Sequence, residues 1–268
     1  MVPMKEQLQQ IQAVAIVTFL CVLISVHSDG DYGKWFVVEG AREDITYADV
    51  TDSNGNVTTV ATEADDYNFQ YSYYLNYYEQ YNSADQTISS VSYASADCQD
   101  CTNQDEAAGN IKILAYGTAI IALSVAYMAN NSVKSLHNKN LRSSLSNLKY
   151  VAIIVLIFGL LTGFLFYTTW PEALIMDEGM ISVEQEGVNP RLGCIVEGQA
   201  PNEFNFYNKG NCEEYIPAEV SGDSDLISAR LTSNEWKPGM GFFIVLIGST
   251  LTGGGTLYIL GNIDEEWQ

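Results

Sequence analysis

The sequence predicts an α-helical membrane protein, a four-helix transmembrane bundle that carries a small extracellular α+β domain. Three observations favour this fold class. The apolar residues gather in four long blocks instead of spreading along the 268-residue chain. Two of the segments between these blocks are long and acidic. The third segment is short and basic.

The third and fourth apolar blocks are long enough to cross a bilayer, and the first two are at the short end but can be extended by flanking residues. The four blocks cover about residues 11–26, 113–129, 151–169 and 240–260, and none has Asp, Glu, Lys or Arg in its interior. A transmembrane helix needs about 20 mainly apolar residues. Buried helices of a soluble protein are the alternative, but four charge-free blocks are rare in soluble folds. The first block also fits a cleaved signal peptide, which would leave three spans.

The distribution of charge predicts the orientation of the spans. The net charge is −21, yet residues 130–149 hold four basic residues and no acid. Residues 29–110 carry a net charge of −14 and residues 171–238 a net charge of −9. Short cytoplasmic loops are enriched in Lys and Arg, so the basic segment is expected in the cytoplasm. A nucleic-acid partner is excluded, because it needs a basic face.

This topology predicts a multi-pass protein of the cell membrane with both termini in the cytoplasm. In chain order we expect a tail (1–10), a first span (11–27), a first outer segment (28–110), a second span (111–129), a basic loop (130–149), a third span (150–169), a second outer segment (170–238), a fourth span (239–261) and a second tail (262–268). Trp35, Trp170 and Trp236 lie just outside these spans. They fit either the membrane interface or the core of the outer domain.

The first outer segment predicts a small antiparallel sheet followed by a helix. Residues 45–50 and 57–61 are rich in strand-forming residues and flank Asn54-Gly55, a strong hairpin signal because both residues tolerate a positive φ. Aromatic residues then alternate from 67 to 73, as in a strand.

Four further tyrosines have helical spacing. Tyr74, Tyr77, Tyr78 and Tyr81 fall at i, i+3, i+4 and i+7, on one face of a helix. Two interpretations stay open for this face. It packs on the sheet, since a small domain needs such a core, or it contacts a partner, since Tyr is enriched at interfaces.

The cysteines predict disulfides in the outer segments. Cys21 lies within the first span and is expected to act as a small apolar residue. An even number of external cysteines in an oxidising compartment predicts disulfides. Cys194–Cys212 is the favoured pair, and Cys98 and Cys101 then close a tight ring or each cross to the second segment. A zinc site and a redox pair are the alternatives.

The hairpin turn also has part of a calcium-loop spacing, from Asp52 to Glu63, but Val57 replaces the required Gly. Asp49, Asp52 and Glu63 are therefore the candidates for cation binding, without a complete metal site. No catalytic constellation and no phosphate-binding loop is recognisable, so neither enzyme activity nor a cofactor is expected. The spans also lack the ionisable residues of pumps and transporters.

The layout resembles the claudin superfamily, which includes the peripheral myelin, epithelial membrane and calcium-channel gamma proteins. The similar features are Trp35 after the first span, Cys98 and Cys101 before the second, Lys112 at its start, residues 159–162 and Trp170 in and after the third, and a glycine-rich fourth span. The family's Gly-Leu-Trp triplet is absent, the cysteines are closer together and the second outer segment is longer. The resemblance implies four spans, cytoplasmic termini and a β-sheet in the first outer loop.

Together these features predict a non-enzymatic protein that acts in adhesion, as a scaffold or as an accessory subunit. Its expected partners are the lipid bilayer, another membrane or extracellular protein that meets the acidic outer domain, and cations. The alternatives are a component of a channel or transporter, and a redox or metal-handling protein that uses the four outer cysteines.

Overall fold

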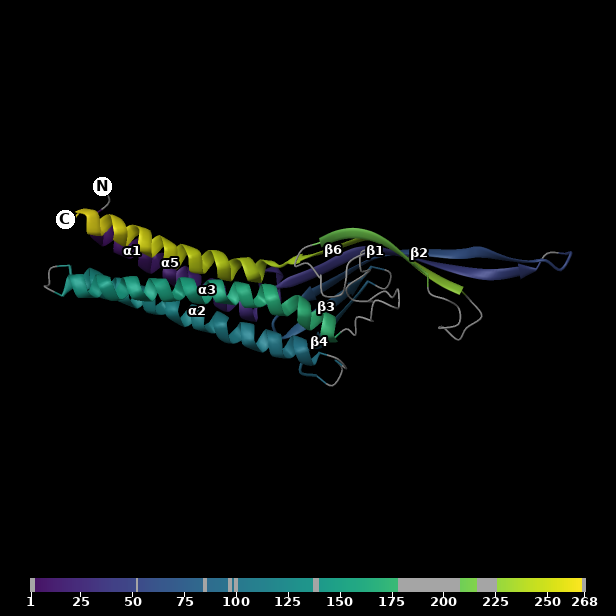
Figure 1. Ribbon diagram of the computed structural model, residues 1–268, viewed down its shortest axis with the longest axis horizontal. Helices are drawn as coiled ribbons and strands as arrows, with labels where there is room; N and C mark the ends of the chain where they lie inside the picture. Colours follow the sequence, from purple (N-terminus) through teal and green to yellow (C-terminus); the bar gives the residue numbers. More distant parts are fainter. Residues whose placement is uncertain are drawn as a thin grey trace. The chain divides into compact units, whose positions relative to one another are not determined.

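The computed structural model describes residues 3–51, 53–83, 86–95, 98, 101–136, 140–177, 208–215 and 226–266. The chain forms two compact units (Figure 1). The helical unit comprises Met1–Trp35, Asp105–Trp170 and Gly239–Gln268, and the sheet unit comprises Phe36–Gln104 and Pro171–Pro238.

Four long helices confirm the four expected apolar blocks. They are α1 (Met4–His27), α2 (Thr102–Lys134), α3 (Leu141–Asp177) and α5 (Met240–Glu266). By length and composition each is fit to span a membrane. The helices run beyond the expected spans, and only a short connection remains between α2 and α3. Most of the predicted basic loop is therefore helical.

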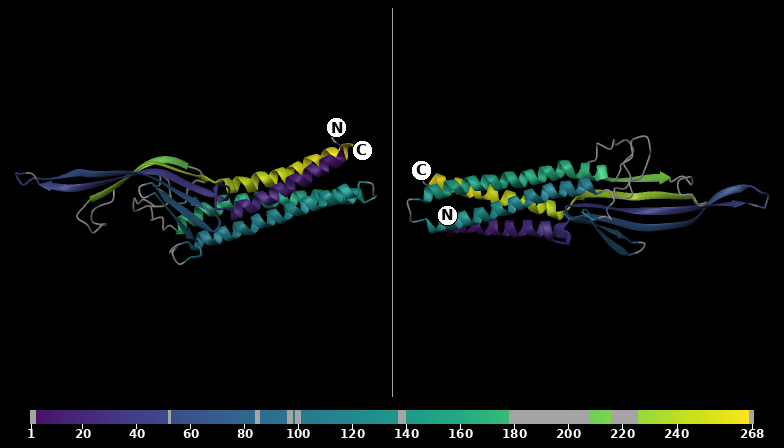
Figure 2. Two further views of the ribbon diagram at one scale, coloured as in Figure 1. Left: turned by 180° about the vertical axis from the view of Figure 1, so that it is seen from behind. Right: turned by 90° about the horizontal axis from the view of Figure 1, so that it is seen from below.

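Helix α5 packs closely against α1 and α3 through small residues, and the helices lie side by side in both views of Figure 2. A Cβ added to Gly159 on α3 would lie 1.9 Å from the Ser249 Oγ atom on α5. On the α1 side, the Thr18 hydroxyl donates a hydrogen bond to the Gly248 carbonyl oxygen (3.1 Å) and accepts one from the Thr252 hydroxyl (2.8 Å). Small residues allow this close approach of membrane helices.

Trp35 and Trp170 are core residues of the helical unit, not of the sheet unit, and neither ring is exposed as an interfacial Trp would be. Each side chain is fully buried. The Trp35 Nε1 atom donates a hydrogen bond to the Ser25 carbonyl oxygen (2.8 Å), and both indole rings pack on Phe166. A Cβ on Gly241 would lie 2.7 Å from Trp35 Nε1, so this position requires glycine. Trp236 lies in a strand, and its side chain is outside the described residues.

The sheet unit contains a six-stranded antiparallel sheet in the order β4-β3-β2-β1-β6-β5. Strands β1 to β4 come from the first outer segment, and β5 and β6 from the second. Their bounds are Phe36–Thr51 (β1), Val57–Tyr73 (β2), Tyr77–Asn82 (β3), Thr87–Ser92 (β4), Asn208–Tyr215 (β5) and Leu226–Pro238 (β6).

The predicted hairpin at Asn54-Gly55 is confirmed. Strands β1 and β2 pair until Thr51 lies opposite Val57. Gly55 has a φ of +83°, whereas Asn54 keeps a negative φ, so glycine alone supplies the left-handed conformation.

The predicted helix over the tyrosine tract is wrong. Tyr74 begins a tight turn in which its N–H donates to the Tyr77 carbonyl oxygen (2.9 Å), and Tyr77–Asn82 forms β3. The turn separates two aromatic strands, β2 and β3. Its length gives the four tyrosines a helical spacing by coincidence. Pairing of β3 with both β2 and β4 satisfies more backbone groups than an isolated helical turn could. In the described residues, the sheet unit therefore holds a β-sheet and the ends of α2 and α3, without a helix of its own.

Candidate functional site

Along strands β1 to β3 the sheet has one aromatic face and one mixed face, which carries both polar and apolar side chains. Phe36, Phe69, Tyr71, Tyr73 and Tyr78 alternate onto the same face and are all buried. Tyr73 lies opposite Tyr78, with ring centroids 5.8 Å apart. This face forms the core of the sheet unit. On the opposite face Val37 and Ser72 are buried, Glu39 and Glu79 are half-buried and Tyr81 is exposed.

The four tyrosines proposed for partner contact do not share one surface. Tyr74 and Tyr78 are buried, at 2% and 5% exposure, while Tyr81 is 38% exposed. The Tyr74 ring stacks on Tyr77 with centroids 4.5 Å apart, and its hydroxyl donates to the Glu79 carboxylate (3.0 Å). Tyr74 and Tyr78 are thus structural, and partner contact stays a prediction that Tyr81 fits best.

A small ion-pair cluster lies on the mixed face and joins β1 to β6. The Lys237 ammonium donates to the Glu39 carboxylate (2.5 Å) and to the Glu235 carboxylate (3.1 Å). These bonds, the one to Glu39 above all, raise the pKa of Lys237 above its usual value. The Lys237 side chain is 37% exposed, and pairs this accessible contribute little stability. The sequence carries no signal for this pairing, because Glu39 and Lys237 are far apart in the chain.

The cysteines nearest α2 form a disulfide. Cys98 and Cys101 are bonded, with Cα atoms 5.7 Å apart, and this tight ring was one of the two expected arrangements. Both are nearly buried, at 9% and 2% exposure. Cys194 lies outside the described residues, as does the side chain of Cys212, so their pairing stays a prediction. Cys21 is a free thiol in α1.

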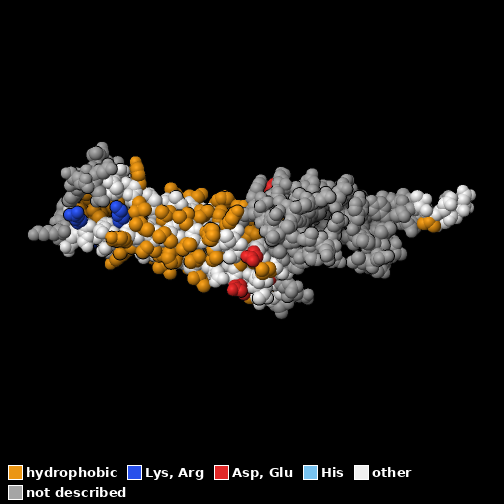
Figure 3. Space-filling model, in the orientation of Figure 1, with side chains coloured by type: hydrophobic (Ala, Val, Ile, Leu, Met, Phe, Trp, Pro, Cys, Tyr) orange, Lys and Arg blue, Asp and Glu red, His pale blue; other side chains and the backbone are white. Residues whose placement is uncertain are grey.

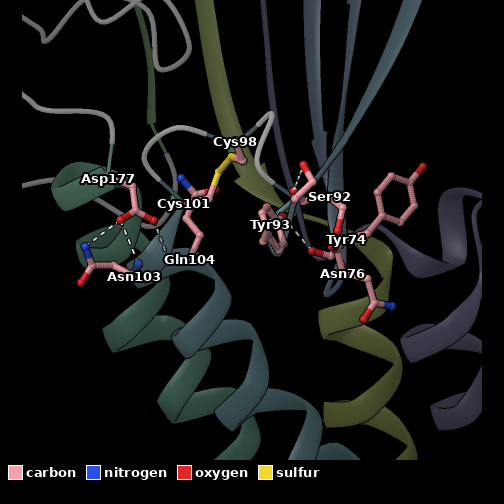
Figure 4. The surroundings of a disulfide bond; sticks show 10 residues. Tyr74, Asn76, Ser92, Tyr93, Cys98, Cys101, Asn103, Gln104 and Asp177 are labelled. Atoms are coloured by element: carbon pink, nitrogen blue, oxygen red, sulfur yellow. Dashed lines mark hydrogen bonds between the residues drawn. A yellow bond between two sulfur atoms is a disulfide. The ribbon is translucent and has the colours of Figure 1, made fainter.

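Directly after the disulfide, a residue of another helix caps α2 (Figure 4). Asp177, at the end of α3, accepts hydrogen bonds from the backbone N–H of Asn103 (2.8 Å) and of Gln104 (2.6 Å), and a third from the Asn103 side chain (2.6 Å). A carboxylate at a helix N-terminus satisfies free N–H groups and complements the helix dipole. The cap lies far from α2 in sequence, so no local pattern reveals it.

Gln104 makes this turn costly to form. Its side chain is fully buried, and neither polar atom of its carboxamide has a hydrogen-bond partner among the described residues. Burying an unsatisfied polar group costs about 1–3 kcal/mol. The disulfide and the Asp177 cap, one on each side of Gln104, offset this cost and hold the turn closed.

Two of the three predicted cation-binding residues lie in the strands of the β1–β2 hairpin. Asp49 belongs to β1 and Glu63 to β2, opposite Thr59 and Thr46 respectively. Their side chains, and Asp52 as a whole, lie outside the described residues. The segment is a strand–turn–strand unit rather than a loop between helices, as the hairpin interpretation expects. Across the part of the chain that is described, no cluster of His, Cys, Asp and Glu could hold a metal ion.

Comparison with protein families, with curated proteins and with solved structures found no match. The claudin-like layout therefore stays a proposal that rests on topology and on the residues named above.

Proposed function

We propose that this chain is a non-enzymatic, four-span membrane protein that holds an acidic sheet outside the cell for contact with other proteins. It would act in adhesion, as a scaffold or as an accessory subunit. The interior of the helical unit carries this proposal. In its described part, every buried polar side chain is a Ser or Thr. Transport pathways use ionisable residues within the spans, so the bundle fits a membrane anchor better than a conduit.

The surface of the helices supports a bilayer as their surroundings. Hydrophobic side chains form a continuous band over the helices on the face in Figure 3, and Ile120, Phe164 and Tyr258 are each more than 60% exposed. Exposed apolar surface of this extent marks a membrane or protein contact.

Charges at the two ends of this band support the orientation. Lys134, Arg142 and Lys149 are exposed near the connection between α2 and α3, while Asp105 and Glu106 are exposed at the opposite end of α2. The basic end fits the cytoplasm. Both termini would then lie inside the cell and both acidic segments outside.

Site-specific photo-cross-linking tests the proposal. A photoreactive amino acid is placed at Tyr81 of the full chain in native membranes, and in a matched control at Ile120 of α2, which is 63% exposed. We expect a discrete protein adduct from position 81 and only lipid adducts from position 120. No protein adduct from position 81, together with selective ion flux through reconstituted vesicles, would replace this proposal with the channel alternative.

A further inference from the structure

Among the described strands, β4 lies at one edge of the sheet. The Tyr93 N–H donates to the Asn76 carbonyl oxygen (3.3 Å), and the ladder continues with Ser92 opposite Tyr77 and Ser90 opposite Glu79. Backbone groups alternate in an antiparallel ladder. Those of Ser89 and Val91 therefore face β3, and those of Ile88, Ser90 and Ser92 point away from the sheet. The Ser92 carbonyl oxygen accepts bonds from Ser95, but the remaining outward groups have no strand beside them in the described residues.

This edge lacks the features that usually prevent strand addition. Natural proteins protect exposed edges with charges, prolines or bulges. Thr87–Ser92 has none of these, and Ile88 is 70% exposed. The opposite edge, β5, contains Lys209, Glu213 and Glu214.

Strand β4 is also the one strand of the six without a charged residue. The neutral stretch extends from Gln86 to Ser95, within an outer segment that carries a net charge of −14. Each of the other strands contains at least one charge, for example Glu39 (β1), Glu63 (β2), Glu79 (β3), Glu213 (β5) and Lys237 (β6).

We propose that the β4 edge pairs with the β4 edge of a second copy of this chain, antiparallel and centred on Ser90. A basic partner would require acidic residues on the edge strand, and β4 has none. A second copy brings the same negative field, so its contact strip must be neutral, because opposed like charges destabilise strand pairs.

The distance between acidic residues across the proposed contact keeps their electrostatic repulsion weak. Among the acids that the structure describes on the sheet, Glu79 on β3 is the one paired with β4, opposite Ser90. In the paired copies, the two Glu79 residues would be three strand spacings apart, about 14 Å at roughly 4.8 Å per strand. The screening length is about 8 Å at physiological salt. Repulsion across the contact is therefore weak, whereas an acid on β4 itself would lie within the screening length of its copy.

Cysteine cross-linking of the full chain in lipid nanodiscs tests the pairing. On a background in which the free Cys21 is replaced by Ala, Ser90→Cys would place two thiols directly opposite each other, within the range that a disulfide spans. Ser89→Cys is the matched control. Ser89 is also exposed and lies on the same strand, but its side chain points to the other face. We expect mild oxidation to give at least about tenfold more disulfide-linked dimer from Ser90→Cys than from Ser89→Cys, with a peptide linking position 90 of two chains.

A second variant removes a backbone hydrogen bond from the proposed contact between the two β4 strands. Ser90→Pro deletes an outward N–H and leaves the bonds to β3 intact, and edge strands tolerate proline at such positions. We expect Ser90→Pro to be monomeric by mass photometry where Ser90→Ala remains dimeric. Equal cross-linking at positions 89 and 90, or a Ser90→Pro protein that remains dimeric, overturns the pairing.

The inference deepens the proposed function, because it names the partner of the outer sheet. Different experimental results would overturn the β4 pairing and the proposed function. A monomeric chain whose position 81 still captures a different protein would overturn the pairing and leave the proposed function standing.

Discussion

At the scale of single residues, two adjacent glycines of α5 have opposite surroundings. A Cβ on Gly253 would lie 2.7 Å from the Ala152 carbonyl oxygen, whereas a Cβ on Gly254 would meet nothing within 4 Å. We expect Gly253→Ala to destabilise the helical unit by about 1–3 kcal/mol through overpacking. Gly254→Ala should leave it unchanged or stabilise it by up to about 1 kcal/mol, because alanine favours the helix. Thermal unfolding in detergent measures both, and equal melting temperatures would contradict the close packing of α5 on α3.

The Asp177 cap gives a second prediction at this scale. Asp177→Ala removes three hydrogen-bond acceptor contacts at the start of α2. Loss of a helix cap costs about 0.5–2 kcal/mol, so we expect faster amide hydrogen exchange at Asn103 and Gln104 and a lower melting temperature. Glu172→Gln is the control, since Glu172 is an exposed acid of the same helix. Unchanged exchange in Asp177→Ala would show that the disulfide alone holds the turn.

At the scale of elements, the sequence predicts the helices and the first two strands well. A charge-free apolar block of about 16 to 21 residues has few alternatives to a helix. Asn54-Gly55 between β-prone runs has few alternatives to a hairpin. The tyrosine tract fails because residues 74–81 satisfy a helical period while their partners, β2 and β4, favour a strand. Period alone cannot distinguish a helix from two short elements joined by a turn.

The hairpin itself gives a third prediction. Gly55 has a φ of +83°, which costs other residues about 1–2 kcal/mol. Gly55→Ala should therefore loosen the ends of β1 and β2, with faster hydrogen exchange at Val57 and Thr58. Gly30→Ala is the control, because Gly30 has a φ of −105° and its new Cβ would meet only the Ser28 Oγ atom, at 3.5 Å. If Gly55→Ala leaves exchange unchanged, the turn does not depend on the left-handed conformation.

The Asp177 cap and the Lys237 ion pair cannot be predicted from the sequence, for a physical reason. Asp177 caps a residue 74 positions earlier, and Lys237 pairs with a residue 198 positions earlier. Both depend on which strands and helices become neighbours, and local spacing carries no information about that. The Cys98–Cys101 ring could be anticipated because its partners are close in the chain.

At the scale of the whole molecule, the distribution of charge predicts the topology. A reagent that cannot cross membranes should label a cysteine introduced by Ser83→Cys in intact cells, because Ser83 follows β3 in the segment that the charge distribution predicts outside. It should not label Ser143→Cys, which lies between Arg142 and Lys149 near the basic end of α3. The parental chain gives the background labelling. Labelling at position 143 would reverse the assignment of inside and outside.

The acidity of the outer segments gives the last prediction. Their net charges of −14 and −9 imply that carboxylates repel one another at low ionic strength. Above about 0.1 M salt the screening length falls to roughly 10 Å or less, so this repulsion weakens. We expect the melting temperature of the sheet unit, followed in the full chain, to rise from dilute buffer to high sodium chloride.

Repeating the series with millimolar calcium at fixed ionic strength separates screening from binding. A rise with sodium chloride alone indicates general screening, and a further rise with calcium indicates a carboxylate site, which Asp49→Asn, Asp52→Asn and Glu63→Gln should remove. A flat melting temperature in both series would mean that the acids are solvated and too far apart to repel.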